Sequence, residues 1–334
     1  MAANAGACMK RVIIDTDPGI DDTAAIFFAL TSGALQVEML TTVFGNVDVE
    51  QATRNALTIL EVAGRPDIPV YQGAGRPLNG DTPTYSPRIH GRNGLGDVEI
   101  NPPRTSPGQG RGAERLVEAI MAAPGEITLL AIGPLTNVAL ALSLEPRIAG
   151  ALQQLILMGG AVRTPGNITA VASANLYNDA EAASLVYRSG APLVQIGLDV
   201  CRPTVITHAH LDRLRAGGNA MTTFLTAITP VIQAFYRQTY RQEAGVHYND
   251  VPAIAYAIDP GLFRAERMPV LIETAGNLTR GQTVPDWHRQ WGMEPNVEVC
   301  LEVDAQRLAD QFTDTLVRGE VVPAAAREPT ANLV

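Results

Sequence analysis

The stretch Arg11–Asp22 reads RVIIDTDPGIDD and decides the fold that we predict. Its apolar start predicts a buried strand, and the Pro18-Gly19 pair predicts a sharp turn. Helix-forming sequence follows from Ile20. In an open parallel sheet, ligands bind beyond the carboxyl ends of the strands. We therefore expect a functional site where this strand ends.

The rest of the chain alternates short apolar runs with helix-forming segments. The runs predict buried strands at Arg11–Asp17, Val37–Phe44, Ile127–Ile132, Gln154–Met158, Pro192–Leu198 and Met268–Ile272. Periodicity predicts helices at Asp21–Thr31, Val49–Ala63, Ala113–Met121, Leu135–Leu144, Ala180–Ser189, Ala220–Gln242 and Asp250–Ala257. This alternation is typical of an α/β fold with a Rossmann-like core, in which helices cover both faces of a mostly parallel open sheet.

We find neither a linker nor an internal repeat, so we predict one domain over residues 1–334. Two segments, 79–112 and 161–178, are rich in glycine, proline or polar residues and predict long loops. Such loops in α/β folds are usually functional. The two ends, 1–10 and 322–334, are expected to be flexible.

Composition excludes several classes of function. A net charge of -9 argues against a protein that binds the phosphate backbone of nucleic acid. No apolar run approaches the roughly 20 residues that span a bilayer, and the start lacks the order of a secretory signal. The cysteines, Cys8, Cys201 and Cys300, have neither metal-site nor disulfide spacing. We expect a cytoplasmic protein that binds neither nucleic acid nor membrane.

Four carboxylates, those of Asp15, Asp17, Asp21 and Asp22, fall within eight residues and have no lysine or arginine among them. Like charges this close raise one another's pKa unless a positive charge lies between them. Oxygen ligands favour Ca²⁺ or Mg²⁺, and Ca²⁺ is preferred if a backbone carbonyl also contributes. Helix capping by Asp17 and a dipole effect at the first helical turn would explain only one or two of these acids. The cluster therefore predicts a metal site.

The acidic motif and a series of later motifs resemble the nucleoside hydrolases, the inosine-uridine preferring ribohydrolase family. The order and spacing of these motifs agree from about residue 11 to about residue 315. In chain order they are Asp15–Asp22, Gly45-Asn46, His90-Gly91, Gly94–Gly96, Ile132–Asn137, Met158–Gly160, Gly166-Asn167, Asn175, Asp179–Ala182, Asn249-Asp250, Pro252–Tyr256 and Thr279–Val284.

The resemblance implies an enzyme that hydrolyses the N-glycosidic bond of ribonucleosides to ribose and free base, in purine or pyrimidine salvage. One Ca²⁺ would be held by Asp17, Asp22, Asp250 and the backbone carbonyl of Ile132, and Asp17 would activate a metal-bound water as general base. By the same resemblance, substrate contacts would come from Asp21, Asn46, His90, Met158, Asn167, Ser173 and Asn175. The family is often dimeric or tetrameric, so a homo-oligomer is expected.

These roles agree with the chemistry. Cleavage of a ribosidic bond passes through an oxocarbenium-like state, which nearby carboxylates stabilise. A metal ion lowers the pKa of water, and an adjacent carboxylate can take the proton. Without the resemblance, we would interpret Asp250 as a helix cap. For Asn137 we keep the interpretation of a turn or capping residue.

Two positions depart from the family pattern. Many members have Glu-Phe-Asn where this chain has Ser173-Ala174-Asn175, so the carboxylate expected at the ribose 5′-hydroxyl is a serine. This predicts tolerance of 5′-modified nucleosides. The second departure is Asn249, where some members have a histidine that helps the base leave. Candidates on the leaving-group side are His247, Asn249, Tyr236 and Tyr240, and the two tyrosines share a helix face as core packing or as a wall for the base.

Two rival functions remain open at this stage. A haloacid dehalogenase-type phosphatase also has an Asp-x-Asp motif after its first strand, but the sequence that follows differs here. A nucleoside- or ribose-binding protein without turnover is the other rival, motivated by Ser173 and Asn249.

Overall fold

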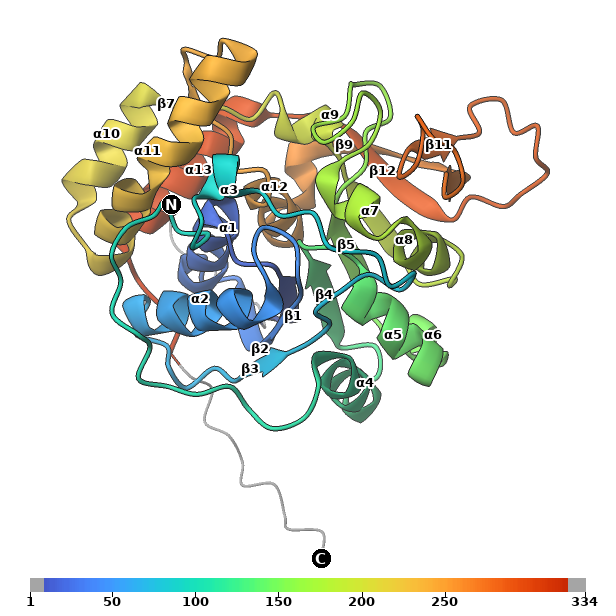
Figure 1. Cartoon of the computed structure of the whole chain (residues 1–334), viewed down its shortest axis with the longest axis horizontal. Helices are drawn as coiled ribbons and strands as arrows, with labels where there is room; N and C mark the ends of the chain where they lie inside the picture. The colour runs from blue at the N-terminus through green and yellow to red at the C-terminus, as the bar shows by residue number, and fades with distance from the viewer. Residues whose placement is uncertain (1–8, 324–334) are drawn as a thin grey trace, which may run out of the picture.

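Strand β1 (Lys10–Thr16) lies inside an eight-stranded sheet of order β3-β2-β1-β4-β5-β6-β12-β9 (Figure 1). The structure is a computed structural model that describes residues 9–323. All neighbouring strands are parallel except β12 and β9 at one edge. The other strands of the sheet are β2 (Leu35–Thr42), β3 (Val70–Gln72), β4 (Ile127–Ala131), β5 (Gln154–Met158), β6 (Leu193–Ile196), β9 (Phe263–Met268) and β12 (Val297–Val303). Two small antiparallel pairs join β7 (Ile206–Thr207) to β8 (Gly245–Val246) and β10 (Val270–Ile272) to β11 (Thr283–Pro285).

Helices pack on both faces of the sheet because its strands are apolar on both sides. In β1, Val12 and Ile14 belong to one buried cluster, whereas Ile13 belongs to the other. The first cluster includes residues of α1 (Ile20–Thr31), α2 (Val49–Val62), α10 (His208–Gly217), α11 (Ala220–Tyr240), α12 (Val251–Ile258) and α13 (Ala305–Arg318). The second includes residues of α4 (Gly112–Ala122), α5 (Thr136–Leu144), α6 (Ile148–Ala151) and α8 (Ala180–Tyr187). Four short helices, α3 (Pro87–His90), α7 (Ala174–Asn178), α9 (Leu198–Cys201) and the 3₁₀ turn η1 (Pro260–Leu262), lie in the connections.

Helix α1 is buried along its whole length. Its sequence is apolar around nearly the full circumference, which is typical of a helix enclosed by other elements. Phe28 packs edge-on against Phe312 of α13, with ring centroids 5.6 Å apart. The first turn of this central helix carries Asp21 and Asp22, so the core fixes the position of both carboxylates.

The predicted fold class is confirmed, with two kinds of error in its elements. The run Met268–Ile272 was predicted as one strand, which is wrong: β9 ends at Met268 and β10 starts at Val270 in a different sheet. Pro269 lies between them and cannot donate a ladder hydrogen bond. The prediction also missed β12 and α13. The β12 sequence VEVCLEV alternates in the way typical of a half-buried strand, and in α13 the apolar residues Leu308, Phe312 and Leu316 recur every four residues.

The predicted loops and ends can be compared only within residues 9–323. The segment 79–112 is irregular apart from α3 and the start of α4, and 161–178 is irregular apart from α7 and one isolated bridge. Flexibility at 1–8 and 324–334 lies outside the described residues. At the inner edges, Lys10 begins β1, and the backbone of Val322 bonds to both Leu30 and Arg65; flexibility of the ends stays a prediction. No helix within 9–323 has the length and apolarity that crossing a membrane requires.

Asn137 joins three elements beneath the end of β1, at the start of α5. Its Nδ2 donates to the Asp15 carboxylate at 2.7 Å and to the Thr42 carbonyl at 2.9 Å. Its Oδ1 accepts from the backbone of Ala74 at 2.8 Å. Asn137 is completely buried, and Asp15 is held there by Asn137 and Thr41. Asn137 therefore has a structural role, but not the predicted one: it lies inside α5 and bonds to neighbouring segments instead of capping a helix or forming a turn, and it takes Asp15 out of the acidic cluster.

We predict that Asn137→Ala lowers the free energy of unfolding by about 3 kcal/mol, because it leaves buried polar groups without partners. Denaturant unfolding would measure this loss. Asn79→Ala is the matched control, since Asn79 is exposed and should change stability little. An equal effect of the two substitutions would contradict the structural role of Asn137.

Candidate active site

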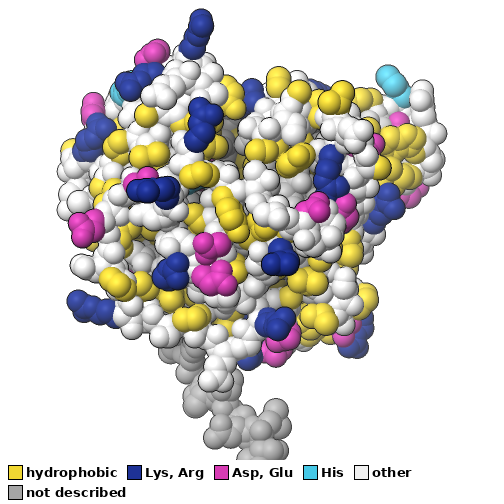
Figure 2. Space-filling model, viewed as in Figure 1, with side chains coloured by type: hydrophobic (Ala, Val, Ile, Leu, Met, Phe, Trp, Pro, Cys, Tyr) yellow, Lys and Arg dark blue, Asp and Glu magenta, His cyan; other side chains and the backbone are white. Residues whose placement is uncertain are grey.

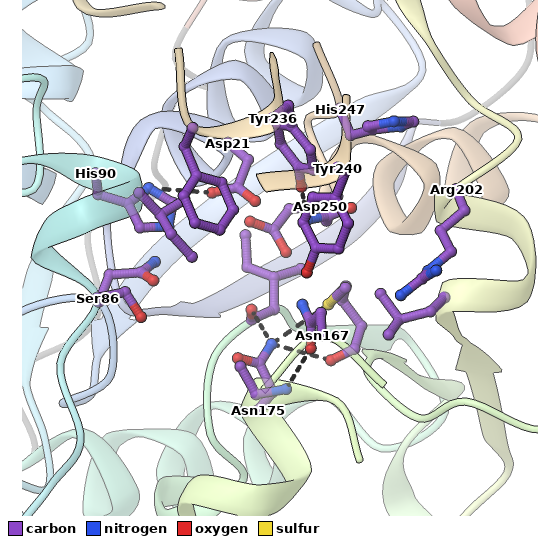
Figure 3. Close-up of a pocket in the computed structure, with 18 of the residues that line it drawn as sticks. Asp21, Ser86, His90, Asn167, Asn175, Arg202, Tyr236, Tyr240, His247 and Asp250 are labelled. Atoms are coloured by element: carbon purple, nitrogen blue, oxygen red, sulfur yellow. Dashed lines mark hydrogen bonds and ion pairs between the residues drawn. The ribbon is translucent and has the colours of Figure 1, made fainter. Parts of the chain in front are cut away.

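A cavity of about 380 Å³ opens beyond the carboxyl ends of the central strands (Figure 3). It lies where the end of β1 predicted a site, because parallel strands bring their carboxyl ends to one edge. The predicted site residues that line it are Asp17, Asp21, Asn46, His90, Ile132, Met158, Asn167, Asn175, Tyr236, Tyr240, His247, Asn249 and Asp250. Sequence reasoning missed Ser86, Ile89, Ala174, Leu198, Arg202, Phe235, Arg241 and Gln242, which come from loops and helix ends that carry no motif.

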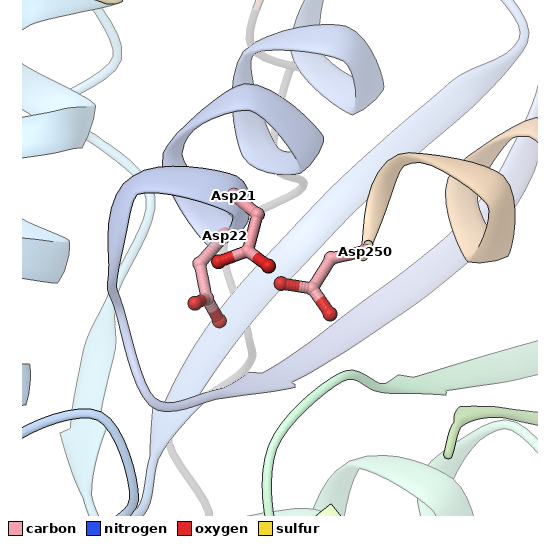
Figure 4. Close-up of side chains that lie close together, drawn as sticks. All are labelled: Asp21, Asp22 and Asp250. Carbon is pink, nitrogen blue, oxygen red and sulfur yellow. The ribbon is translucent and has the colours of Figure 1, made fainter. Parts of the chain in front are cut away.

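Three carboxylates converge beside this cavity, as Figure 4 shows for Asp21, Asp22 and Asp250. Each offers one oxygen, and these oxygens all lie within 4.8 Å of one another. Asp21 and Asp22 stand in the first turn of α1, while Asp250 immediately precedes α12. Among the described residues, no lysine or arginine forms an ion pair with any of them. Segments about 230 residues apart in the chain therefore build one oxygen-rich cluster.

Burial and mutual repulsion govern the ionisation of this cluster. Burial raises the pKa of Asp21 to about 6, and burial together with the charge of Asp21 raises the pKa of Asp22 to about 6. The pKa of Asp17 rises through burial and the charge of Asp22. For Asp250 the pKa rises through burial and the charge of Asp21. Without a positive partner, these carboxylates oppose one another's ionisation.

Asp17 is held by a turn at residues 45–46. The backbone N–H of Asn46 donates to Asp17 Oδ2 at 2.8 Å. A Cβ on Gly45 would overlap that same oxygen, and a Cβ on Gly133 would come within 2.8 Å of Asp17 Oδ1. Glycine is therefore required at residue 45 by close approach. The Asn46 side chain also donates to Asp22 Oδ2 at 3.0 Å, so Asn46 positions two of the carboxylates.

His90 occupies the cavity wall as a neutral imidazole. Its Nδ1 accepts from the backbone N–H of Ile20 at 3.2 Å, which leaves the proton on Nε2. Burial lowers the pKa of His90 to about 4. Its Nδ1 lies 3.7 Å from Asp21 Oδ1, too far for a hydrogen bond. His90 can therefore offer an N–H group to a ligand, and it does not neutralise Asp21.

Asn175 connects the segments that form the floor of the cavity by hydrogen bonds. Its Nδ2 donates to the carbonyl of Ile132 at 2.7 Å and to that of Met158 at 3.1 Å. The neighbouring Asn167 accepts from the backbone of Ala174 at 2.9 Å. These bonds join the ends of β4 and β5 to the start of α7, and together these segments form a polar wall of the cavity (Figure 3).

An aromatic wall faces the acidic cluster and comes mainly from the end of α11. The rings of Tyr236 and Tyr240 lie 5.7 Å apart, and His247 packs edge-on against Tyr236 at 4.8 Å. Asn249 donates to the Tyr236 hydroxyl at 3.0 Å, and its hydrogen bonds also lower the pKa of Asp21. Both tyrosines line the cavity, and Tyr236 also packs against the buried core, so a wall for the base stays a prediction.

The family described as inosine-uridine preferring nucleoside hydrolase matches residues 12–310. The chain belongs to this family. Uridine nucleosidase 1 from Arabidopsis thaliana is 39% identical over 319 residues, covering 92% of this chain and 94% of that protein. A pyrimidine-specific ribonucleoside hydrolase from Salmonella gallinarum is 34% identical over 305 residues, covering 91% and 97%. The structure of a purine-preferring ribonucleoside hydrolase from Gardnerella vaginalis superimposes with a TM-score of 0.89 at 32% identity, covering 93% and 99%.

The family match confirms the resemblance found in the sequence, and it makes this chain a nucleoside hydrolase, an enzyme of the N-ribohydrolase class. Because the match runs over nearly the whole chain, it favours a nucleoside hydrolase over the haloacid dehalogenase-type phosphatase.

One predicted substrate contact of this nucleoside hydrolase is corrected by the structure. Ser173 does not line the cavity; its hydroxyl is buried and accepts from the backbone N–H of Gly160 at 2.6 Å. The short side chain reaches only the adjacent turn, so the cavity wall there is formed by Ala174. Ser173 places no side chain in the cavity, and tolerance of 5′-modified nucleosides stays a prediction.

We predict that Gly45→Ala lowers kcat about a hundredfold, because the new methyl group displaces the Asp17 carboxylate from its position. Steady-state kinetics on a ribonucleoside, with thermal unfolding in parallel, would measure this. Gly150→Ala is the matched control, since a Cβ there meets nothing within 4 Å. Wild-type kinetics in folded Gly45→Ala would show that the close approach is unimportant.

Proposed function

We propose that this nucleoside hydrolase is calcium-dependent and acts on pyrimidine ribonucleosides, with uridine as the substrate to test first. The choice of base is supported by the two relatives named for uridine and pyrimidine nucleosides. The single observation that carries the proposal is the convergence of Asp21, Asp22 and Asp250 oxygens beside a cavity with an aromatic wall.

The cluster fits a hard divalent cation. One buried oxygen, Asp21 Oδ1, has no hydrogen-bond partner, and the available donors are all oxygens. We propose that Asp22 and Asp250 of this cluster hold the ion together with Asp17 and the Ile132 carbonyl, which the family resemblance adds, and that Asp21 lies beside it for a ribose hydroxyl. When bound, calcium would neutralise the carboxylates, polarise the attacking water and orient the sugar.

Asp17 is the proposed general base. It lines the cavity, and its carboxylate is fixed by Asn46 and by the two glycines that pack against it. It would take a proton from the water that adds to C1′. The remaining carboxylates would stabilise the positive charge that develops on the ribose as the glycosidic bond breaks.

Tyr236 is the proposed proton donor to the leaving base. Its hydroxyl accepts from Asn249, so its own proton is free to point elsewhere. His247 is less suited to this role. Its Nδ1 faces the Thr204 carbonyl at 3.1 Å and must carry the proton, which leaves Nε2 as an acceptor beside Gln242. Tyr240 would then serve as a wall for the base.

Removal of calcium is the first test. We predict that a chelator abolishes the release of ribose from uridine and that added Ca²⁺ restores it. Asp17→Asn should lower kcat about a thousandfold in the folded protein. Asp212→Asn, at an exposed position, is the matched control. Turnover that survives chelation would contradict the metal site, and uridine binding without turnover by wild-type protein would favour the ribonucleoside-binding alternative.

Tyr236→Phe tests the leaving group separately. We predict that kcat for uridine falls about a hundredfold or more, because the base leaves without a proton. A nitrophenyl riboside, whose leaving group needs no proton, should lose far less. Tyr71→Phe, outside the cavity, is the control. Equal losses on both substrates would mean that Tyr236 acts by shaping the cavity.

The expected homo-oligomer and cytoplasmic location stay predictions. Size measurement in solution and fractionation of cells would test them.

A further inference from the structure

Two arginines, Arg202 and the exposed Arg241, line a cavity whose carboxylates are those of Asp17, Asp21 and Asp250. Of the two, Arg202 is the more buried. It follows the last residue of α9 and is half-buried. In Figure 3 its side chain reaches in from α9, on the opposite side of the view from Asp21 and His90. The proposed mechanism uses the carboxylates and the tyrosines of this cavity and gives no role to Arg202.

The guanidinium is fixed between two segments of the cavity wall. Its Nη2 donates to the carbonyl of Gly166 at 2.8 Å, and its Cζ lies 5.9 Å from the ring centroid of Tyr240. Within residues 9–323 it forms no ion pair, unlike Arg280 with Glu181 or Arg65 with Asp67. A guanidinium has five N–H donors. Most of those on Arg202 are thus available to a ligand.

The wall beside Arg202 contains no carboxylate. The cavity residues adjoining it through the chain are Leu198, one helical turn before Arg202, and Asn167, which follows Gly166 and bonds to Ala174. Ser173, which directly precedes Ala174, is neutral and bonds to Gly160 outside the cavity. Nothing on this wall would repel a negatively charged group, and Arg202 would attract one.

The chemistry of the site orients a nucleoside in the cavity. The reacting C1′ must lie at Asp17, and the planar base fits the aromatic wall of Tyr236 and Tyr240. Polar residues line the cavity on two sides, Asn46, Ser86 and His90 on one and Asn167 and Asn175 on the other. The 5′ end of the ribose would face Asn167 and Asn175, the side on which the Gly166 carbonyl holds Arg202. Gly166, which holds Arg202, directly precedes Asn167.

We propose that Arg202 binds an anionic group at the 5′ position and that nucleoside 5′-monophosphates are a substrate class of this enzyme. The inference rests on the proposed function, because it uses the same reaction. Water adds its oxygen to C1′, the C1′–N bond breaks with its electron pair going to the base, and the base takes a proton. The products are ribose 5-phosphate and free base, and the phosphate ester is untouched.

The test compares uridine with uridine 5′-monophosphate in the calcium-loaded enzyme. Chromatography measures released uracil, and a phosphate assay detects any prior loss of the phosphate group. We expect wild-type protein to release uracil from both. Arg202→Gln should lower the ratio of kcat/KM for the monophosphate to that for uridine about tenfold or more, and Arg202→Lys should lower it less. Arg163→Gln, a partly exposed arginine outside the cavity, should leave the ratio unchanged.

Three results would overturn the inference. The first is cleavage of uridine alone by the wild-type enzyme. The second is an equal loss of kcat/KM for both substrates in Arg202→Gln, which would assign Arg202 to the base or to cavity shape. The third is release of inorganic phosphate before uracil. Failure on uridine itself would instead overturn the proposed function.

Discussion

The site depends on the burial of several aspartates at the end of one strand without a compensating cation from the chain. Burying an unpaired carboxylate is costly, and placing a second one beside it adds repulsion. Here Asp21 and Asp22 are held in the first turn of a helix whose every residue is buried, so they cannot move to solvent. Asp250 arrives from the far end of the chain to face them. Only a strongly packed α/β core can impose such an arrangement.

Hydrogen bonds and one close backbone approach keep the aspartate side chains of the cluster apart and fix their orientation. Asn46 bonds to Asp17 and Asp22, and Gly45 permits the close approach that places Asp17. Asp15 belongs to the same motif, but its carboxylate has a structural role. It is drawn to Thr41 and Asn137 inside the sheet, and its pKa rises to about 7 through burial. One motif therefore supplies both structural and reactive acids.

Much of this could be predicted from the sequence, because the fold and the acidic motif are local signals. The strand, turn and helix of residues 11–31 follow from apolar periodicity and from Pro18-Gly19. The position of Asp250 follows from the family resemblance alone, since locally it is a helix cap. Arg202 and Gln242 could not be predicted, because helix ends and loops reach the cavity only through tertiary packing. Ser173 was wrongly predicted to contact the substrate for the same reason, because the direction of its side chain depends on the turn at Gly160.

The division of charge within the cavity follows from how the fold brings its parts together. The end of β1, the first turn of α1 and the start of α12 provide the acids, and these elements are buried in the core. The basic and aromatic residues come from helix ends, Arg202 after α9 and Tyr240 at the last position of α11. Substitutions at those ends disturb fewer buried contacts than substitutions in α1, since loops and element termini carry less of the core. The proposed activation of water is therefore tied to the part of the fold that tolerates least change, whereas the proposed protonation of the base and binding of the 5′ end are tied to helix ends.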